Sequence, residues 1–182
     1  MMDGFKRKTP EEILLSISKL HRGSLKIYIG AVSGSGKTYH MLRDGHTLKG
    51  QGIDVVICAV STLQRPETVE QLGDLERVPS IHWMQDGVEQ KDLNLDALLE
   101  RNPEVVLVDG LAHLNRKGAL FPTRIEDIKY LLTHDISVIT TVNVYELESA
   151  MAVAHKLTGI EVGHCVPLDT LELADEVRLI DA

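Results

Sequence analysis

Aromatic residues are scarce in this sequence, making up 4% of its 182 residues. Proteins that bind single-stranded nucleic acid without sequence preference stack the bases on aromatic side chains, so the scarcity argues against such a surface. The formal net charge of −8 argues the same way, because polyanions are bound through clustered lysine and arginine side chains. We therefore expect no nucleic-acid partner, and we expect anionic membrane surfaces to be disfavoured.

Cysteines and long apolar runs are also lacking. Cys58 and Cys165 are the only two cysteines, so we expect neither a disulfide framework nor a cysteine metal cluster. The eight histidines are scattered and do not have the spacing of a metal site. No apolar run approaches the roughly 20 residues that span a bilayer, and the polar N-terminus lacks the apolar core of a signal peptide. These absences predict a cytoplasmic protein that does not itself insert into a membrane, although a parent protein could tether it to the inner face.

What the sequence does contain is a strand, a glycine-rich turn and a helix in direct succession, over Lys26–Leu42, KIYIGAVSGSGKTYHML. The strand is predicted over Lys26–Ala31 because that stretch is apolar and β-branched. Gly34 and Gly36 then space the turn and can adopt positive φ. Such a turn is typical of a phosphate-binding P-loop, in which backbone amides and the helix N-terminus hold phosphate oxygens.

The residues around this turn supply the remaining chemistry. Lys37 would bridge the β- and γ-phosphates, and the hydroxyl of Thr38 would bind Mg²⁺. Val105–Asp109, VVLVD, is a second apolar strand that ends in a carboxylate, and Asp109 would hold a Mg²⁺-bound water opposite Thr38. The consensus P-loop begins with glycine where this chain has Ala31. A turn that needs glycine only for its shape is the alternative, but it does not explain why lysine and threonine follow.

Strand and helix patterns alternate along the rest of the chain. Strands are predicted over Asp54–Val60, Ile81–Met84, Ile136–Val142 and Glu176–Ile180, and helices over Glu67–Leu75, Asp92–Arg101, Arg124–Leu132 and Val144–Leu157. The alternation predicts an α/β fold of the P-loop NTPase-like type, with a doubly wound, mostly parallel sheet flanked by helices. The length predicts a single domain. Residues 1–24 would form an N-terminal helical appendage, with Thr9 as the N-cap of its helix, and residues 25–182 a nucleotide-binding core.

Four ordered stretches also carry a resemblance. They are LKIYIGAVSGSGKTYHML, VVLVDGLAHLN, ITTVNVYELES and ADEVRLIDA. They look like the motifs G-A-A-P-G-V-G-K-T, V-L-V-D-E-L-A-H-T-N, T-T-L-N-V-Q-H-L-E-S and A-D-E-V-E-L-V-D of the N-terminal cytoplasmic domain in the KdpD family, the osmosensitive potassium-channel sensor histidine kinases. The resemblance extends over nearly all of Thr9–Ala182, and the alanine at the start of the P-loop is shared with the family.

The resemblance implies an ATP-binding regulatory domain that responds to potassium and osmotic status. Its partners would be the nucleotide and a protein of a potassium-sensing two-component system, and it could form a homodimer. Together, the motif and the resemblance predict nucleotide contacts from Gly34, Ser35, Gly36, Lys37, Thr38, Tyr39, Asp109, His113 and Asn115, with Mg²⁺ held by Thr38 and Asp109. A structural or solvated role is the more ordinary alternative for His113.

Two departures from the family motifs bear on catalysis. Gly110 stands where the family has an acidic residue that could polarise an attacking water, and Ser61-Thr62-Leu63 replaces a family E-T-H. We therefore expect a binder or sensor without efficient hydrolysis, and we assign no catalytic residue. The alternatives are an ATPase or small-substrate phosphotransferase, a scaffold that binds only a protein partner, and a stand-alone regulator that binds another phosphate ligand such as a cyclic dinucleotide.

Overall fold

The structure, a computed structural model, describes residues 23–31, 36–60, 70–147 and 165–180. Several predicted features lie outside these ranges: the appendage helix with Thr9 as its N-cap, the turn residues Gly34 and Ser35, the loop after the second strand, and most of the predicted helix Val144–Leu157. Among the residues described, no helix is both long and apolar enough to cross a membrane.

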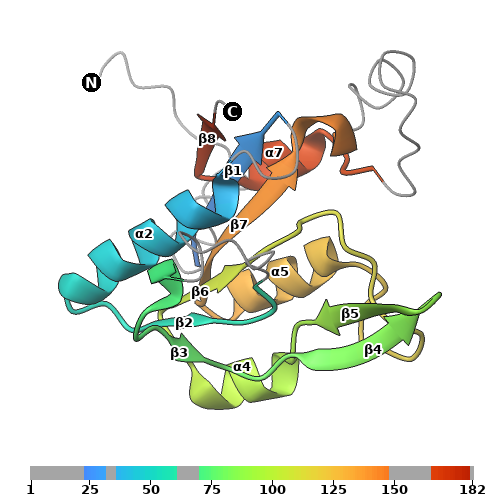
Figure 1. Cartoon of the computed structure of the whole chain (residues 1–182), viewed down its shortest axis with the longest axis horizontal. Helices are drawn as coiled ribbons and strands as arrows, with labels where there is room; N and C mark the ends of the chain where they lie inside the picture. Colours follow the sequence, from blue (N-terminus) through green and yellow to red (C-terminus); the bar gives the residue numbers. More distant parts are fainter. Residues whose placement is uncertain (1–22, 32–35, 61–69, 148–164, 181–182) are drawn as a thin grey trace, which may run out of the picture.

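Six parallel strands form one sheet in the order β3-β2-β6-β7-β1-β8. Their bounds are Leu25–Gly30 (β1), Val55–Ile57 (β2), Glu76–Arg77 (β3), Val105–Val108 (β6), Ser137–Asn143 (β7) and Glu176–Ile180 (β8). The helices are α2 (Lys37–Gly50), α4 (Leu95–Arg101), α5 (Arg124–Thr133), the 3-10 turn η1 (Val144–Glu146) and α7 (Asp169–Leu173). The α/β fold with a parallel, helix-flanked sheet is as predicted (Figure 1).

Helices cover both faces of the sheet because its central strands are apolar on both sides. In β6, Val105 and Leu107 share one buried cluster with Met41 and Leu42 of α2. The alternate residues Val106 and Val108 belong to a second cluster, together with the buried side chains of α4 and α5. Side chains alternate across a strand, so a continuous apolar run can serve two helical layers at once.

A separate antiparallel hairpin lies beside this sheet, formed by β4 (Ile81–Gln85) and β5 (Val88–Asp92). The sequence predicted a strand over Ile81–Met84 but missed β5, and the helix expected from Asp92 begins only at Leu95, where the side chain of Asn94 accepts a hydrogen bond from the amide of Ala97. The turn between the strands, Asp86-Gly87, has φ of 50° and 80°, as two-residue hairpin turns require. An Asp-Gly pair was therefore a readable hairpin signal.

Most other predicted elements formed with small shifts of their ends, but β2 is shorter than expected. The run Asp54–Val60 forms a strand only over Val55–Ile57, and Ala59 has a φ of 56°, which is incompatible with extended backbone.

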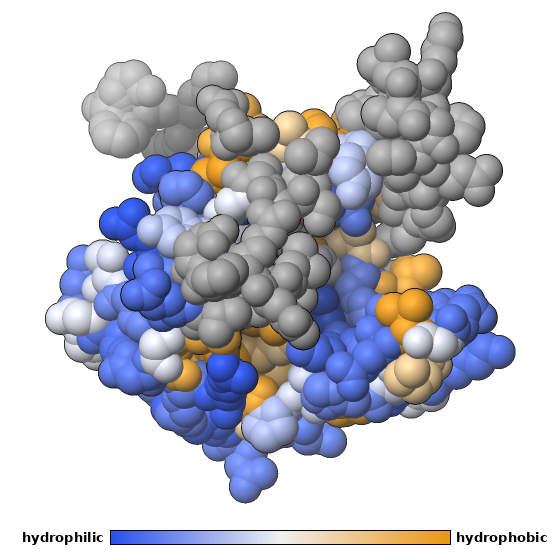
Figure 2. Space-filling view, viewed as in Figure 1, coloured by the Kyte–Doolittle hydropathy of each residue, from blue (hydrophilic) through white to orange (hydrophobic). Residues whose placement is uncertain are grey.

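The outer surface is mainly hydrophilic in the view of Figure 2, with scattered apolar residues. Exposed apolar side chains include Met84 and Val88 of the hairpin.

Candidate functional site

Three neighbouring strands, β6, β7 and β1, bring their carboxyl ends to one edge of the sheet. Asp109 follows β6, Asn143 ends β7, and the turn into α2 follows β1. In open α/β sheets, ligands bind outside the carboxyl ends of the strands, where adjacent connections diverge. The polar residues that gather at this edge therefore form the candidate site.

The carboxylate of Asp109 lies at the centre of the site. Its Oδ1 accepts a hydrogen bond of 2.9 Å from the hydroxyl of Thr38, at the start of α2. The same oxygen accepts one of 3.1 Å from the buried hydroxyl of Thr141 on β7, and that hydroxyl in turn accepts one of 3.0 Å from the amide of Gly110. The two residues predicted to hold Mg²⁺ are thus brought together although 71 positions separate them.

Lys37 is the first residue of α2 and is almost fully buried. Its Nζ donates a hydrogen bond of 2.6 Å to Oδ1 of Asn143, at the carboxyl end of β7. Gly36 precedes the helix with a φ of 98°, a conformation that glycine adopts without a steric penalty. The predicted phosphate contacts Gly34 and Ser35 lie outside the described residues.

Tyr39, the remaining predicted contact on α2, lies among side chains of its own helix. Its ring meets that of His40 edge-on at 5.8 Å between centroids, and the guanidinium of Arg43 lies 5.8 Å from its centre.

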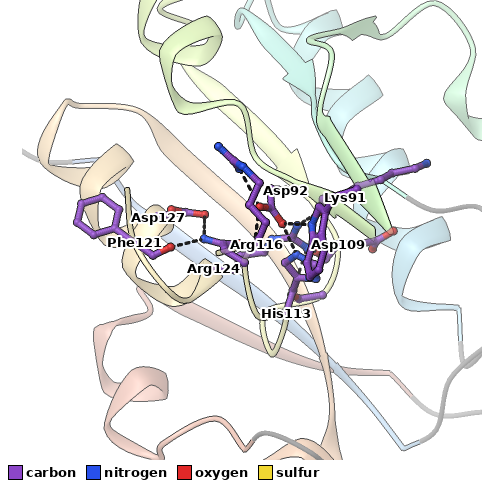
Figure 3. A network of polar contacts seen from close by, with 11 residues as sticks. Lys91, Asp92, Asp109, His113, Arg116, Phe121, Arg124 and Asp127 are labelled. Carbon is purple, nitrogen blue, oxygen red and sulfur yellow. Dashed lines mark hydrogen bonds and ion pairs between the residues drawn. The ribbon is translucent and has the colours of Figure 1, made fainter. Parts of the chain in front are cut away.

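The predicted contact His113 belongs to a polar network around the buried carboxylate of Asp92 (Figure 3). Nε2 of His113 lies 2.7 Å from Oδ1 of Asp92, which also accepts a 2.8 Å bond from the indole of Trp83, while Arg116 donates to Oδ2 from its amide and its guanidinium. Burial alone would raise the pKa of Asp92, but these hydrogen bonds hold it below its usual value. Burial and the nearby charge of Arg124 lower the pKa of His113, against the opposing effect of Asp92, which favours a neutral imidazole.

The side chain of Asn115 forms hydrogen bonds within the loop between β6 and α5 and to α5 itself. Its Nδ2 donates to the carbonyl of Phe121 at 3.0 Å and to Oδ2 of Asp127 at 2.8 Å. Burial raises the pKa of Asp127 to about 6, although the hydrogen bond from Asn115 and the charge of Arg124 oppose the shift. Through these two hydrogen bonds, Asn115 stabilises the loop between β6 and α5.

Sequence reasoning missed three residues of the site: Thr141, Asn143 and Arg124. Each carried a signal. The polar Thr-Thr pair interrupts the otherwise apolar β7, Asn143 matches the asparagine of the family motif in ITTVNVYELES, and an arginine at the first position of α5 is disfavoured by the helix dipole. The buried guanidinium of Arg124 donates from Nη1 to the carbonyl of Asp109 at 2.6 Å and from Nη2 to the carbonyl of Lys91. Burial lowers the pKa of Arg124 to about 10, so the side chain keeps its charge at neutral pH.

A cavity of about 370 Å³ opens beside Asp109. Its lining includes Lys91, Asp109, Gly110, His113 and Arg124, so Asp109 both contacts Thr38 and lines the cavity.

The donor set suits a hard cation. A hydroxyl and a carboxylate oxygen are ligands that Mg²⁺ accepts, and Mg²⁺ typically completes its shell with water and substrate phosphates. In the part of the chain that the structure describes, no group of three or more His, Cys, Asp or Glu side chains could hold a metal ion. A metal at Thr38 and Asp109 would therefore depend on phosphate and water for its other ligands.

Comparison with known proteins identifies the family. The family described as "KdpD: Osmosensitive K+ channel His kinase sensor domain" matches residues 21–182. The sensor protein KdpD of Escherichia coli (strain K12) is 40% identical over 175 residues, which cover 96% of this chain and 20% of that protein. KdpD of Mycobacterium tuberculosis (strain H37Rv) is 39% identical over 95% of this chain and 20% of its own length, and a putative KdpD of Synechocystis is 40% identical over 88% of this chain and 43% of its own. The chain thus spans about a fifth of the first two relatives.

Solved structures overlap this chain only loosely. The flagellar accessory protein FlaH from Methanocaldococcus jannaschii has a TM-score of 0.44 and 17% identity, over 75% of this chain and 68% of its own. The DnaC helicase loader has a TM-score of 0.43 and 17% identity, over 98% and 94%. The fold class is defined by the strand order and the parallel register of this chain itself.

Proposed function

Because this chain belongs to the KdpD family of osmosensitive K+ channel His kinase sensor domains, we propose that it is a nucleotide-binding regulatory domain whose ligand is ATP with Mg²⁺. The observation that carries the proposal is the 2.9 Å hydrogen bond between the Thr38 hydroxyl and the Asp109 carboxylate. It places a hydroxyl at the start of the helix that follows β1 against a carboxylate at the end of β6, two strands away in the sheet, which is the arrangement that P-loop proteins use for Mg²⁺.

In this proposal, the cationic Lys37 binds phosphate, and the oxygen-bearing Thr38 and Asp109 bind the metal and its water. The ammonium group of Lys37, directly after the glycine-rich turn, would exchange its contact with Asn143 for the β- and γ-phosphates. Thr38 would bind Mg²⁺ through its hydroxyl, and Asp109 would hold a water of the metal's shell. Bound Mg²⁺ would neutralise phosphate charge. The amides of Gly34, Ser35 and Gly36 would complete the phosphate contacts, and Tyr39, His113 and Asn115 stay more peripheral candidates.

Binding without efficient hydrolysis is the mode that we propose. Residue 110 is glycine with a φ of +75°, so it offers no side chain to polarise a water, and a side chain added there would be strained. His113 also lines the cavity beside residue 110, but its Nε2 is engaged by the buried carboxylate of Asp92. An ATPase or phosphotransferase reaction is the alternative, and turnover that disappears in Asp109→Asn would establish it.

The setting that we propose is cytoplasmic, with the domain acting inside a KdpD-type potassium or osmotic sensor. The E. coli and M. tuberculosis relatives are sensor proteins about five times as long as this chain, so kinase output, membrane attachment and the protein partner of the two-component system would belong to the longer proteins. A homodimer of this domain is part of the same proposal.

The proposal is tested by the thermal stability of the domain with and without MgATP. A ligand that binds only the folded state adds about 2.7 kcal/mol to the free energy of unfolding at a hundredfold excess over Kd. We expect this gain in the wild type and its loss in Lys37→Ala. Lys49→Ala is the matched control, because Lys49 lies at the other end of α2 and pairs with Asp74 at the surface. Identical melting with and without nucleotide in wild type and Lys37→Ala would refute the proposal.

The same titration separates ligand identities. A P-loop contacts phosphates, so a panel of ATP, ADP, GTP and a cyclic dinucleotide, each with and without Mg²⁺, is needed to identify the base and the phosphate number. A response to the cyclic dinucleotide alone would replace ATP as the ligand and would leave the phosphate-binding role of Lys37 in place.

A further inference from the structure

Arg124 is buried to 3% exposure at the N-terminus of α5. That position is unfavourable for a cation in two respects, since burial removes hydration from the charge and the helix dipole places partial positive charge at the N-terminus. The helix itself is started by a different residue, because the side chain of Thr123 accepts the capping hydrogen bond from the amide of Glu126. The placement of Arg124 must therefore be explained by what its guanidinium contacts.

The guanidinium donates to main-chain carbonyls of two separate segments (Figure 3). Nη1 donates to the carbonyls of Asp109, at 2.6 Å, and of Gly110, at 3.4 Å. Nη2 donates to the carbonyl of Lys91 on β5. Arg124 thus joins the hairpin to the backbone that directly follows β6. Because these bonds are to backbone, Arg124 fixes the path of the chain, while the Asp109 carboxylate accepts from Thr38 and Thr141.

The peptide group between residues 109 and 110 is consequently held at both ends. Arg124 binds the carbonyl of Asp109 from one side, and the hydroxyl of Thr141 accepts the amide of Gly110 from the other. That hydroxyl also donates to the Asp109 carboxylate. Gly110 fits this clamp closely, since a Cβ at that position would lie 3.3 Å from Nη1 of Arg124. The clamp sets the backbone from which the Asp109 side chain projects toward Thr38.

From this geometry we infer that Arg124 is a positioning residue of the metal side of the site. It holds the Asp109 main chain so that the carboxylate faces the Thr38 hydroxyl, and it thereby sets how strongly Mg²⁺ promotes nucleotide binding. The inference rests on the proposed nucleotide function and deepens it. A fixed carboxylate loses little freedom when it accepts a metal-bound water, whereas a carboxylate on a loose backbone must first be ordered.

The experiment measures the affinity for ATP by calorimetry, once with Mg²⁺ and once with EDTA, in the whole chain. The quantity of interest is the ratio of the two affinities. We expect Arg124→Lys, which keeps the charge but loses the planar fork, to lower this ratio about tenfold while the affinity in EDTA changes less than about twofold. Arg116→Gln is the matched control: it removes a cation of the same polar network that contacts Asp92 but not the 109–110 backbone, and the ratio should stay at the wild-type value.

Two further variants protect the test against misfolding of Arg124→Lys. Thr141→Val preserves the side-chain shape and removes the other end of the clamp, so it should also lower the Mg²⁺ ratio. In the Asp109→Asn background, Arg124→Lys should cause no additional loss of the ratio, since two residues that act through one group are not additive.

The outcomes are separable. An unchanged ratio in folded Arg124→Lys and Thr141→Val, or an equal loss of affinity with and without Mg²⁺, would overturn the positioning role and leave a structural one. Additive losses in Arg124→Lys combined with Asp109→Asn would overturn it too. If the wild type binds no nucleotide in either condition, the proposed function fails, and the inference that rests on it fails with it.

Discussion

The ammonium group of Lys37 lies 2.6 Å from the side-chain oxygen of Asn143, so the first residue of α2 is bonded to the last residue of β7 across the mouth of the site. Asn143 also starts the turn η1, in which its side chain and that of Glu146 form reciprocal capping bonds, and its Nδ2 donates to the hydroxyl of Tyr145 at 3.1 Å. The group that would hold phosphate is thus bonded to a neutral amide oxygen, and breaking that hydrogen bond does not separate opposite charges.

Asn143→Asp should weaken nucleotide binding. A carboxylate at this position would keep the capping geometry, since aspartate caps as well as asparagine, but it would hold Lys37 in an ion pair and repel phosphate. We expect ATP affinity to fall at least about tenfold with little change in melting temperature, as measured by calorimetry and thermal unfolding. Asn143→Ser, which keeps a capping oxygen without charge, is the control. An affinity for ATP that stays at the wild-type value in Asn143→Asp would show that Lys37 does not exchange partners.

Gly110→Ala should destabilise the fold by about 1–2 kcal/mol, the usual cost of placing a non-glycine residue at positive φ. The added Cβ also approaches Nη1 of Arg124 at 3.3 Å. Gly110→Asn should cost less, because asparagine tolerates this backbone region better. Urea unfolding of the three proteins checks the order, and equal costs for alanine and asparagine would indicate that the side-chain contact rather than φ sets the penalty.

Asp92→Ala should cost about 3 kcal/mol, in the range found when a buried charged group loses its partner. The substitution removes the acceptor for Trp83, His113 and Arg116 together. Urea unfolding can be followed by the fluorescence of Trp83, the only tryptophan of the chain.

The control for this prediction is Glu89→Gln on the same strand. Glu89 is exposed and pairs with His82 at the surface, so its loss should change stability by less than about 1 kcal/mol. If the two variants lose equal stability, the Asp92 network contributes no more than a surface ion pair.

The stability of the protein should carry a pH-dependent contribution from Asp127. Its pKa is raised from 3.8 to about 6 in the folded state, chiefly by burial, so the folded state binds the proton more tightly than the unfolded state does. The contribution is fully present below about pH 4 and is lost as the pH rises through about 6. The stability difference between wild type and Asp127→Asn, measured by urea unfolding from pH 4 to 7, should therefore shift against the wild type as the pH rises.

The control for this pH series is a substitution in which neither the original nor the new side chain titrates. Ile128→Val changes a buried aliphatic side chain of the same helix, and its difference from the wild type should stay constant over the range. A constant difference for Asp127→Asn as well would contradict the raised pKa.

Local sequence was sufficient for the elements that carry the motifs. The apolar run of β1 and the glycine-spaced turn predicted the start of α2, which the structure places at Lys37. The run Val105–Asp109 predicted a strand, which the structure has as β6 over Val105–Val108, with Asp109 directly after it. The pairing of Asp109 with Thr38 could also be anticipated, because the motif itself states that these two side chains share one ion. The hairpin was readable from Asp86-Gly87, and missing it misassigned Asp92 to a helix.

What the sequence determined, then, is the α/β class, the principal strands and the pairing of Thr38 with Asp109, because strand and helix patterns and P-loop spacing are properties of near neighbours along the chain. The tertiary structure alone decided that β7 lies between β6 and β1, and with it that Thr141 and Asn143 reach the site. It also decided that Arg124 donates hydrogen bonds to the carbonyls of Asp109 and Lys91, which lie 15 and 33 residues away in the sequence. Such contacts depend on the order of strands in space, which local periodicity does not encode.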